Sequence, residues 1–242
     1  RFMSIQPNAL TVRVEDARML TGNGRYVDDW EFPGAAHMVV VRSNHAAARI
    51  VRIDTSAARA LPGVLAVLTG PDFAADGLGD IPCVSIPPAV MGGKWFRTSF
   101  PALAIDRVQC VGQEVAVVIA ATRAGALDAA ERGAIDYEAR PAASTVESAI
   151  APEAPPVWHE RPDNLCFVHE LGDRSRTSAA FAVAHQVTRI RLHNQRLAGS
   201  PLEPRGCIGI FDLNEGRYRL VTSTANPHRI RQLLAEHVLR VP

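Results

Sequence analysis

The longest uninterrupted apolar run in the sequence, residues 115–121, contains only seven residues. That length suits a buried β-strand and is far below the roughly 20 residues that a membrane-spanning helix needs. The 242-residue chain is 47% apolar and 21% charged, which is typical of a packed protein and excludes a wholly disordered one. No basic segment followed by an apolar one opens the chain. The sequence therefore predicts neither a membrane span nor a secretory leader.

Short apolar runs alternate with turns and short helices between residues 36 and 140. β-Branched runs bounded by turn residues predict strands, and capping residues followed by helix formers predict helices. The expected strands are residues 37–42, 48–54, 63–69, 107–111, 114–120 and 134–137, and the expected helical segments are residues 56–60, 71–75 and 122–131. This alternation predicts a compact α/β unit with a mixed sheet.

The second part of the chain begins with a proline-rich stretch, residues 141–178, in which prolines leave little room for regular structure. Residues 180–195 then alternate in polarity and predict a long strand. Residues 207–213 and 217–223 predict a hairpin. Asn226 and Pro227 predict the N-cap and first residue of a helix. These few elements bury little surface, so the sequence predicts an incomplete domain here.

Sequence motifs for common chemistry are absent: there is no GxGxxG, P-loop, HExxH or GxSxG. The four cysteines are scattered without a CxxC pair, so we expect free thiols and a cytoplasmic location. The net charge of +1 hides an uneven distribution, because residues 185–242 carry +5 and the remainder carries −4. This basic end suits an anionic cofactor or an acidic partner surface. Nucleic-acid binding is not expected, because aromatic residues are scarce among these arginines.

Several sequence blocks, taken in order, resemble one family. The blocks are residues 14–29, residues 41–43 with His45, and residues 48–50, 61–64, 106–108, 111–113, 136–138, 201–206, 223–224 and 226–228. Together they resemble the N-terminal part of the large, molybdopterin-binding subunit of the xanthine dehydrogenase, aldehyde oxidase and aerobic carbon monoxide dehydrogenase family. The arginine-rich composition, with 25 arginines and one lysine, is typical of a bacterial member with a GC-rich genome.

The resemblance implies an α+β (mixed α/β) fold. A lead-in over residues 1–19 precedes an α/β hammerhead domain over residues 20–140 and the proline-rich linker over residues 141–178. Residues 179–242 then form the first strands and helix of an incomplete molybdopterin-binding domain. Members of the family hydroxylate a carbon centre or oxidise CO with oxygen taken from water. Their electrons pass to iron–sulfur clusters and FAD, which bacteria usually carry on separate subunits.

The resemblance also implies which residues lie near the cofactor: Glu203, Arg205, Ala225 and Asn226. Glu203 and Arg205 match the family, and we interpret them as a paired carboxylate and guanidinium with a mainly structural role. Ala225 stands where the family has a glutamine, and its methyl group cannot form hydrogen bonds. Three more positions depart from the pattern, since Asn44, Ala47 and Glu114 replace proline, histidine and proline. No catalytic residue and no metal ligand is expected in this chain.

Two functions remain open at this point. The first is a portion of a molybdenum hydroxylase large subunit that is inactive alone. Such a chain would hold molybdopterin only when the missing C-terminal part completes it, and its further partners would be the iron–sulfur and FAD subunits. The alternative is a truncated, non-catalytic paralogue that serves as an assembly or binding module. The departure at Ala225 favours the alternative, whereas the order of the blocks favours the first.

Overall fold

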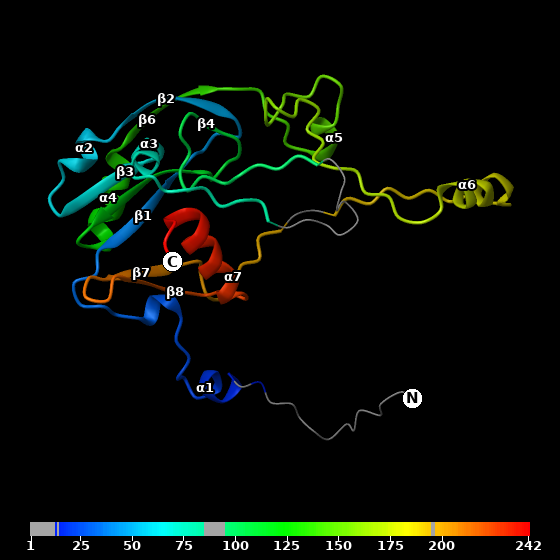
Figure 1. Cartoon of the computed structure of the whole chain (residues 1–242). Helices are drawn as coiled ribbons and strands as arrows, with labels where there is room; N and C mark the ends of the chain where they lie inside the picture. The colour runs from blue at the N-terminus through cyan, green and yellow to red at the C-terminus, as the bar shows by residue number, and fades with distance from the viewer. Residues whose placement is uncertain (1–12, 14, 85–94, 195–196) are drawn as a thin grey trace. The chain divides into compact units, whose positions relative to one another are not determined.

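The computed structural model in Figure 1 describes residues 13, 15–84, 95–194 and 197–242. The chain forms two compact units, one made of Arg1–Pro33 with His193–Ala225 and the other of Gly34–Leu192 with Asn226–Pro242. Most of the expected lead-in, residues 1–12 and 14, lies outside the described residues, as does Gln195 at the end of the expected long strand.

The larger unit contains two three-stranded sheets, and successive strands alternate between them (Figure 1). The first sheet has the order β1-β5-β3 and the second has the order β4-β2-β6. Their strands are β1 (His37–Arg42), β2 (Ala48–Asp54), β3 (Val64–Thr69), β4 (Arg107–Val108), β5 (Glu114–Ala120) and β6 (Ala134–Ala139). Each central strand runs antiparallel to both of its neighbours. The prediction of a mixed sheet is therefore wrong, because residue patterns locate strands but do not specify which strands pair.

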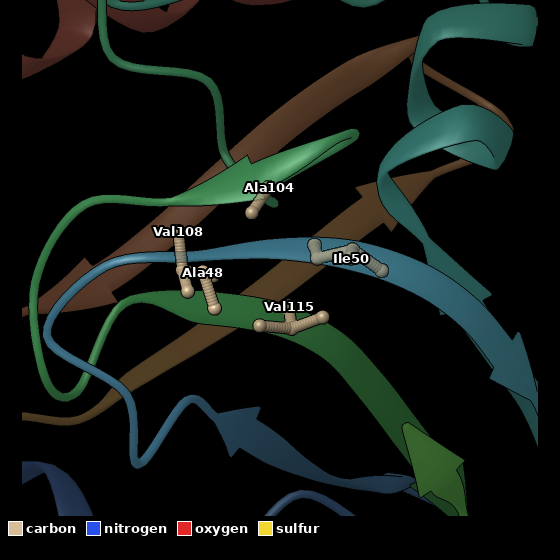
Figure 2. Packing of buried hydrophobic residues seen from close by; sticks show 5 residues of the cluster. All are labelled: Ala48, Ile50, Ala104, Val108 and Val115. Carbon is tan, nitrogen blue, oxygen red and sulfur yellow. The ribbon is translucent and has the colours of Figure 1, made fainter. Parts of the chain in front are cut away.

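Strand β5 is central because its side chains are buried on both faces of its sheet. Val115 packs into one core with residues of the second sheet, and Figure 2 shows that core, which consists of Ala48, Ile50, Ala104, Val108 and Val115. Val118 points to the opposite face, where it packs with Ala58 and Ala129 of the helices α2 (Ser56–Arg59) and α4 (Arg123–Arg132). The apolar run at residues 115–121 thus lies mainly in the strand that contributes to both cores.

Several helices in this unit begin at side-chain caps, and the start of α4 at Thr122 was predicted. Thr122 accepts a hydrogen bond from the Gly125 amide at 3.1 Å and starts α4. Thr69 and Asp72 form a capping box at the start of α3 (Gly70–Ala75). The C-terminal helix α7 (Pro227–Gln232) continues as the π-helical η3 (Leu233–Leu239). The backbone amide of Gly79 donates to the carbonyl of Val238 at 2.9 Å and attaches this end of the chain to the unit.

The proline-rich region and the residues after it differ from the prediction. Two helices occur there, α5 (Val146–Ala149) and α6 (Arg174–Val183). The long strand expected over residues 180–195 is wrong: residues 180–183 belong to α6, and residues 184–194 form no strand. A strand requires a partner for its backbone amides and carbonyls. The described part of the chain supplies no such partner strand to this segment.

The smaller unit contains α1 (Asp16–Leu20), the 3₁₀ helix η1 (Val27–Asp29) and a two-stranded hairpin. The expected hairpin is confirmed as β7 (Cys207–Asp212) paired with β8 (Arg217–Thr222). Gly216 supplies the positive φ of 62° that the connecting turn needs. Across all described residues, the helices are too short or too polar to cross a lipid bilayer.

Candidate cofactor-supporting site

The register of the β7–β8 hairpin places three of the four expected site residues at the same end. Cys207 pairs with Thr222, while the connecting turn lies at the other end beyond Asp212 and Arg217. The Thr222 hydroxyl also donates to the carbonyl of Gly206 at 3.0 Å and closes the open end. Glu203 and Arg205 lead into β7 and Ala225 follows β8. The hairpin therefore brings together residues that are about twenty positions apart in the sequence.

Glu203 anchors the segment around η1 to this end of the hairpin. Its Oε1 atom accepts a hydrogen bond from the backbone amide of Val27 at 3.0 Å, and Val27 is only 8% exposed. That amide lies in the first turn of η1, where amides have no partner within the helix. The Asp29 carboxylate accepts from the amide of Tyr26 at 2.7 Å and completes the turn. Glu203 thus satisfies a donor that would otherwise be buried without an acceptor.

Arg205 does not pair with Glu203, so the expected carboxylate–guanidinium pair is wrong. Arg205 is exposed and forms no ion pair within the described residues. The reason is that the half-buried Glu203 is already bonded to a backbone amide 176 residues away in sequence. The partner Val27 lies inside the first family-like block, but nothing in the sequence links that block to Glu203.

Ala225 and Asn226 follow directly after the hairpin. Ala225 is exposed and offers only a methyl group. Asn226 accepts a hydrogen bond from the Arg229 amide at 3.1 Å through Oδ1, and so it is the predicted N-cap of α7. Pro227 occupies the first position of that helix, also as predicted.

These four residues do not by themselves fit a complete molybdopterin site. The Glu203 carboxylate accepts a hydrogen bond from a backbone amide, as does the side-chain Oδ1 of Asn226, and the side chain of Ala225 has no polar atom. Among them the Arg205 guanidinium is exposed and could meet an anionic group. The described residues also contain no group of three or more His, Cys, Asp or Glu that could hold a metal ion.

The remaining family-like blocks have structural partners in the larger unit. Blocks 41–43 and 136–138 meet, since the rings of His45 and Tyr137 lie 4.8 Å apart and burial raises the pKa of Tyr137. Arg49 forms an ion pair with Glu138 at 2.8 Å, and the hydrogen bond from Arg49, together with the charges of Arg140 and Arg49, lowers the pKa of Glu138. The Arg49–Glu138 pair therefore joins the neighbouring strands β2 and β6 of the second sheet.

Glu114, one of the departures from the family pattern, has a clear structural role. Its carboxylate lies 2.6 Å from Nη1 of Arg42, and the same nitrogen donates to the Gly112 carbonyl at 2.8 Å. The ion pair joins β1 to β5 where the register shifts between Val41 and Arg42. At Ala47 the departure changes only the side chain. The contact that this residue makes is through its backbone, because the Ala47 carbonyl accepts a hydrogen bond from the Arg140 amide. Nothing in the structure explains the departure at Asn44.

A hollow in the larger unit contains none of the four expected residues. It has a volume of about 650 Å³ and lies between the end of the second sheet and the proline-rich segment. Ala46, Ile50, Val108, Pro141 and Val157 contribute to its apolar lining. This hollow therefore belongs to the hammerhead part and not to the open end of the hairpin.

Comparison with known proteins places this architecture in a class. Residues 21–141 match the aldehyde oxidase and xanthine dehydrogenase a/b hammerhead domain, and residues 157–242 match the molybdopterin cofactor-binding domain. The chain therefore consists of a hammerhead domain followed by the start of a molybdopterin-binding domain. The chain belongs to the large-subunit family of xanthine dehydrogenase, aldehyde oxidase and carbon monoxide dehydrogenase, and it corresponds to a portion of such a subunit.

Particular relatives show the extent of the similarity. The carbon monoxide dehydrogenase large chain of Afipia carboxidovorans is 36% identical over 95% of this chain and 29% of its own length. The nicotine 6-hydroxylase large subunit of Paenarthrobacter nicotinovorans is 35% identical over 92% of this chain and 26% of its own length. A crystal structure of Cu,Mo-CO dehydrogenase superposes with a TM-score of 0.79 and 35% identity, over 93% of this chain and 28% of that chain. The chain thus spans less than a third of these relatives.

Proposed function

We propose that the chain supports the molybdenum cofactor from one side within a molybdenum hydroxylase large subunit. The enzyme would oxidise a carbon centre or CO with oxygen derived from water. One observation carries the proposal: the two family domains follow each other in the family order across nearly the whole chain. The residues of this chain would hold the backbone segments at the open end of the hairpin in place and exclude water there. The bound cofactor would supply the redox chemistry.

The four expected residues have distinct roles in this proposal. Glu203 holds the η1 segment against the hairpin, and Asn226 starts α7 immediately after it. Arg205, which is exposed, would contact an anionic group of the cofactor. None of these side chains would move a proton or bind the metal. The isolated chain would therefore be inactive and would not retain the cofactor.

Substrate choice would lie outside these 242 residues. Relatives named for carbon monoxide and for nicotine match the same span at 36% and 35% identity. A crystal structure of quinoline 2-oxidoreductase from Pseudomonas putida 86 matches it with a TM-score of 0.79 and 33% identity. A span that is similarly related to enzymes with such different substrates acts as a shared scaffold.

The partners in this proposal follow from the family. The remaining part of the large subunit would complete the molybdopterin-binding domain, and iron–sulfur and FAD subunits would accept the electrons. Within the chain we propose boundaries at residues 20–140 for the hammerhead, 141–178 for the linker and 179–242 for the start of the cofactor-binding domain. The basic C-terminal part, with +5 over residues 185–242, suits an anionic cofactor and acidic partner surfaces.

The test compares the isolated chain with the assembled large subunit, which is this chain combined with the remaining part on the same or a second polypeptide. Molybdenum is measured by mass spectrometry, and dye reduction is measured with CO, an aldehyde, xanthine and nicotine. We expect about one molybdenum per assembled subunit, activity on one substrate class, and neither in the isolated chain. An assembled subunit that lacks molybdenum and activity would contradict the proposal.

One observation favours the alternative, a non-catalytic assembly module: Ala225 stands at a position where a hydrogen-bonding glutamine is expected. Substituting Ala225→Gln in the assembled subunit separates the two functions. An active enzyme whose KM or kcat changes severalfold on this substitution supports the hydroxylase. A stable assembly that stays inactive with either residue supports the module.

A further inference from the structure

The hollow of about 650 Å³ beside the second sheet has three arginines in its lining, which are Arg49 of β2, Arg107 of β4 and Arg140 just after β6. Its volume is that of an ordinary small-molecule site, about 300–1,000 Å³. None of the four residues that the proposed function uses lies in it. The hollow is therefore a separate candidate for a ligand.

The strand register places these arginines in one row across the second sheet. Arg49 stands directly opposite Arg107 on one side and opposite Glu138 on the other, so the three side chains share a face. The Arg140 amide donates to the Ala47 carbonyl at 2.8 Å and extends the ladder by one residue. Like charges on directly opposite positions destabilise a sheet, so the Arg49–Arg107 pair favours a bound anion.

The carboxylates near this row leave one positive charge uncompensated. Glu138 is shared, because its Oε2 atom lies 2.8 Å from Nη2 of Arg49 and its Oε1 atom lies 3.1 Å from Nη2 of Arg140. Asp106 lies 3.9 Å from Nε of Arg107, which is too long for a hydrogen bond. Three guanidinium groups thus face two carboxylates, and the Arg107 guanidinium remains able to bind a further anion.

The proline-rich side of the hollow is apolar and is held in place by side-chain hydrogen bonds. Residues 155–157 line this side. The Val157 amide donates to Oδ1 of Asn164 at 2.8 Å, and the Val157 carbonyl accepts from Nε2 of Gln109 at 2.7 Å. Gln109 follows β4 directly, so its hydrogen bond ties the apolar lining to the strand that carries Arg107. The hollow is therefore formed before any ligand binds, as small-molecule sites usually are.

We propose that this hollow binds a small organic monocarboxylate with an apolar body. Its carboxylate would accept hydrogen bonds from Arg107 beside the charge of Arg49, because a planar guanidinium matches a planar carboxylate. Its apolar body would contact residues 155–157. A monocarboxylate supplies the one negative charge that the row lacks, whereas inorganic phosphate has no apolar body to bury. The inference goes beyond the proposed function and does not depend on it.

Alkylation of Cys110 reports whether the hollow is occupied, because this exposed thiol is part of the lining. Cys207 is also exposed but does not line the hollow, so it is the control within the same chain. Labelling by iodoacetamide is followed by mass spectrometry at increasing concentrations of octanoate, octan-1-ol or inorganic phosphate. We expect octanoate to slow the labelling of Cys110 at least severalfold and to leave Cys207 unchanged. The other two compounds should slow neither.

The controls identify the other possible occupants. Equal protection of Cys110 by octan-1-ol would show that the hollow recognises only apolar bodies, and equal protection by phosphate would show that it recognises only charge. Either result would overturn the inference, as would octanoate that protects neither thiol or both alike. A Cys110 that is unreactive in the assembled large subunit without octanoate would also overturn it, because the remaining part of that subunit would then fill the hollow.

A matched pair of variants tests the charge. Arg49→Gln and the control Arg52→Gln each remove one exposed guanidinium that holds an ion pair on β2, but only Arg49 lines the hollow. We expect Arg49→Gln to weaken octanoate binding at least severalfold, because guanidinium groups and carboxylates then balance, and Arg52→Gln to leave it unchanged. Arg107→Gln keeps the Arg49–Glu138 ion pair and should weaken binding in the same way even if Arg49→Gln fails to fold. Equal octanoate affinity in Arg107→Gln and Arg52→Gln would contradict the inference.

Discussion

At the scale of single residues, Glu203 acts by accepting a hydrogen bond from a distant backbone amide. Its carboxylate accepts the Val27 amide at 3.0 Å and so joins the start of the described chain to the open end of the hairpin. Hydrogen bonds to charged groups contribute about 1.5–3 kcal/mol, and a buried amide without an acceptor costs a similar amount. Arg205, two residues away, has no such contact and offers a natural comparison.

We predict that Glu203→Ala lowers the free energy of unfolding of the smaller unit by about 1–3 kcal/mol. Glu203→Gln should lose less, because an amide oxygen can still accept from Val27. Urea denaturation followed by circular dichroism measures both. Arg205→Ala serves as the control and should stay within about 0.5 kcal/mol of the parent chain. Equal losses for Glu203→Ala and Arg205→Ala would contradict the role of Glu203.

The capping carboxylate Asp72 gives a prediction for pH. The hydroxyl and the amide of Thr69 both donate to Asp72, each at 2.7 Å, and these hydrogen bonds lower the pKa of Asp72. A lowered pKa in the folded state stabilises the fold above the ordinary aspartate value, near pH 4, and this stabilisation is lost as the pH falls through the folded value. Asp72→Asn should therefore destabilise the chain at pH 7.

Urea denaturation at a series of pH values checks this prediction. The difference in stability between the parent chain and Asp72→Asn should be constant above about pH 5 and should shrink below about pH 4. Asp128→Asn, which changes an exposed carboxylate on α4 without a hydrogen bond in the described chain, is the control. A difference that persists unchanged at pH 2.5 would show that the carboxylate charge is not the cause.

At the scale of elements, the C-terminal helix depends on a close backbone approach. The amide of Gly79 donates to the Val238 carbonyl, and a Cβ at position 79 would overlap the carbonyl oxygen of His237. Glycine is therefore required at this contact for space and not for backbone conformation. The contact decides whether α7 and η3 pack against the larger unit.

We predict that Gly79→Ala detaches α7 and η3 from the loop at Gly79. Backbone amides of residues 233–241 should then exchange with solvent at least severalfold faster. Gly199→Ala is the control, since nothing lies within 4 Å of a Cβ there. Unchanged exchange in Gly79→Ala would mean that the loop moves aside without cost.

The central strand β5 carries the core of the larger unit. Val118 is 1% exposed and lies between the sheet and the helices α2 and α4. We predict that Val118→Ala lowers the free energy of unfolding by about 2–3 kcal/mol, through lost burial and the cavity left behind. Val146→Ala, at an exposed position, should change it by less than about 0.5 kcal/mol. Thermal and urea denaturation measure both variants. Similar losses of unfolding free energy in the two variants would contradict the assignment of Val118 to the core.

At the scale of the whole molecule, the described chain combines two compact units with a long exposed segment. Protein that is exposed and unpaired is cut readily by proteases, whereas residues in sheets are cut only after local unfolding. The chain contains arginines in both settings: Arg174, Arg176, Arg189 and Arg191 in the exposed segment, and Arg49 and Arg52 in β2.

We predict that trypsin cleaves the isolated chain first between residues 174 and 192. Mass spectrometry of a time course should detect cleavage at Arg189 or Arg191 at least tenfold earlier than cleavage at Arg49 or Arg52. In the assembled large subunit the early cleavage at Arg189 and Arg191 should be slowed. Early cleavage within β2 would contradict the described sheet.

Much of the fold was predictable because helix ends and short strands depend on neighbouring residues. The strand bounds of β1 and β2, the hairpin and the Asn226 cap were predicted and are confirmed. The pairing of strands was not, since β1 pairs with β5 across about eighty residues of sequence. The long strand was predicted from its pattern alone, and residues 184–194 do not form it within the described chain.

The sequence by itself determined the local elements, the family and the apolar run that became β5. Only the tertiary structure decided the division into two antiparallel sheets and the partner of Glu203. It also decided that Arg49 and Glu138 serve the fold. The physical reason is that local propensity and capping act over a few residues. Strand pairing and buried hydrogen bonds, in contrast, join groups that are far apart along the chain.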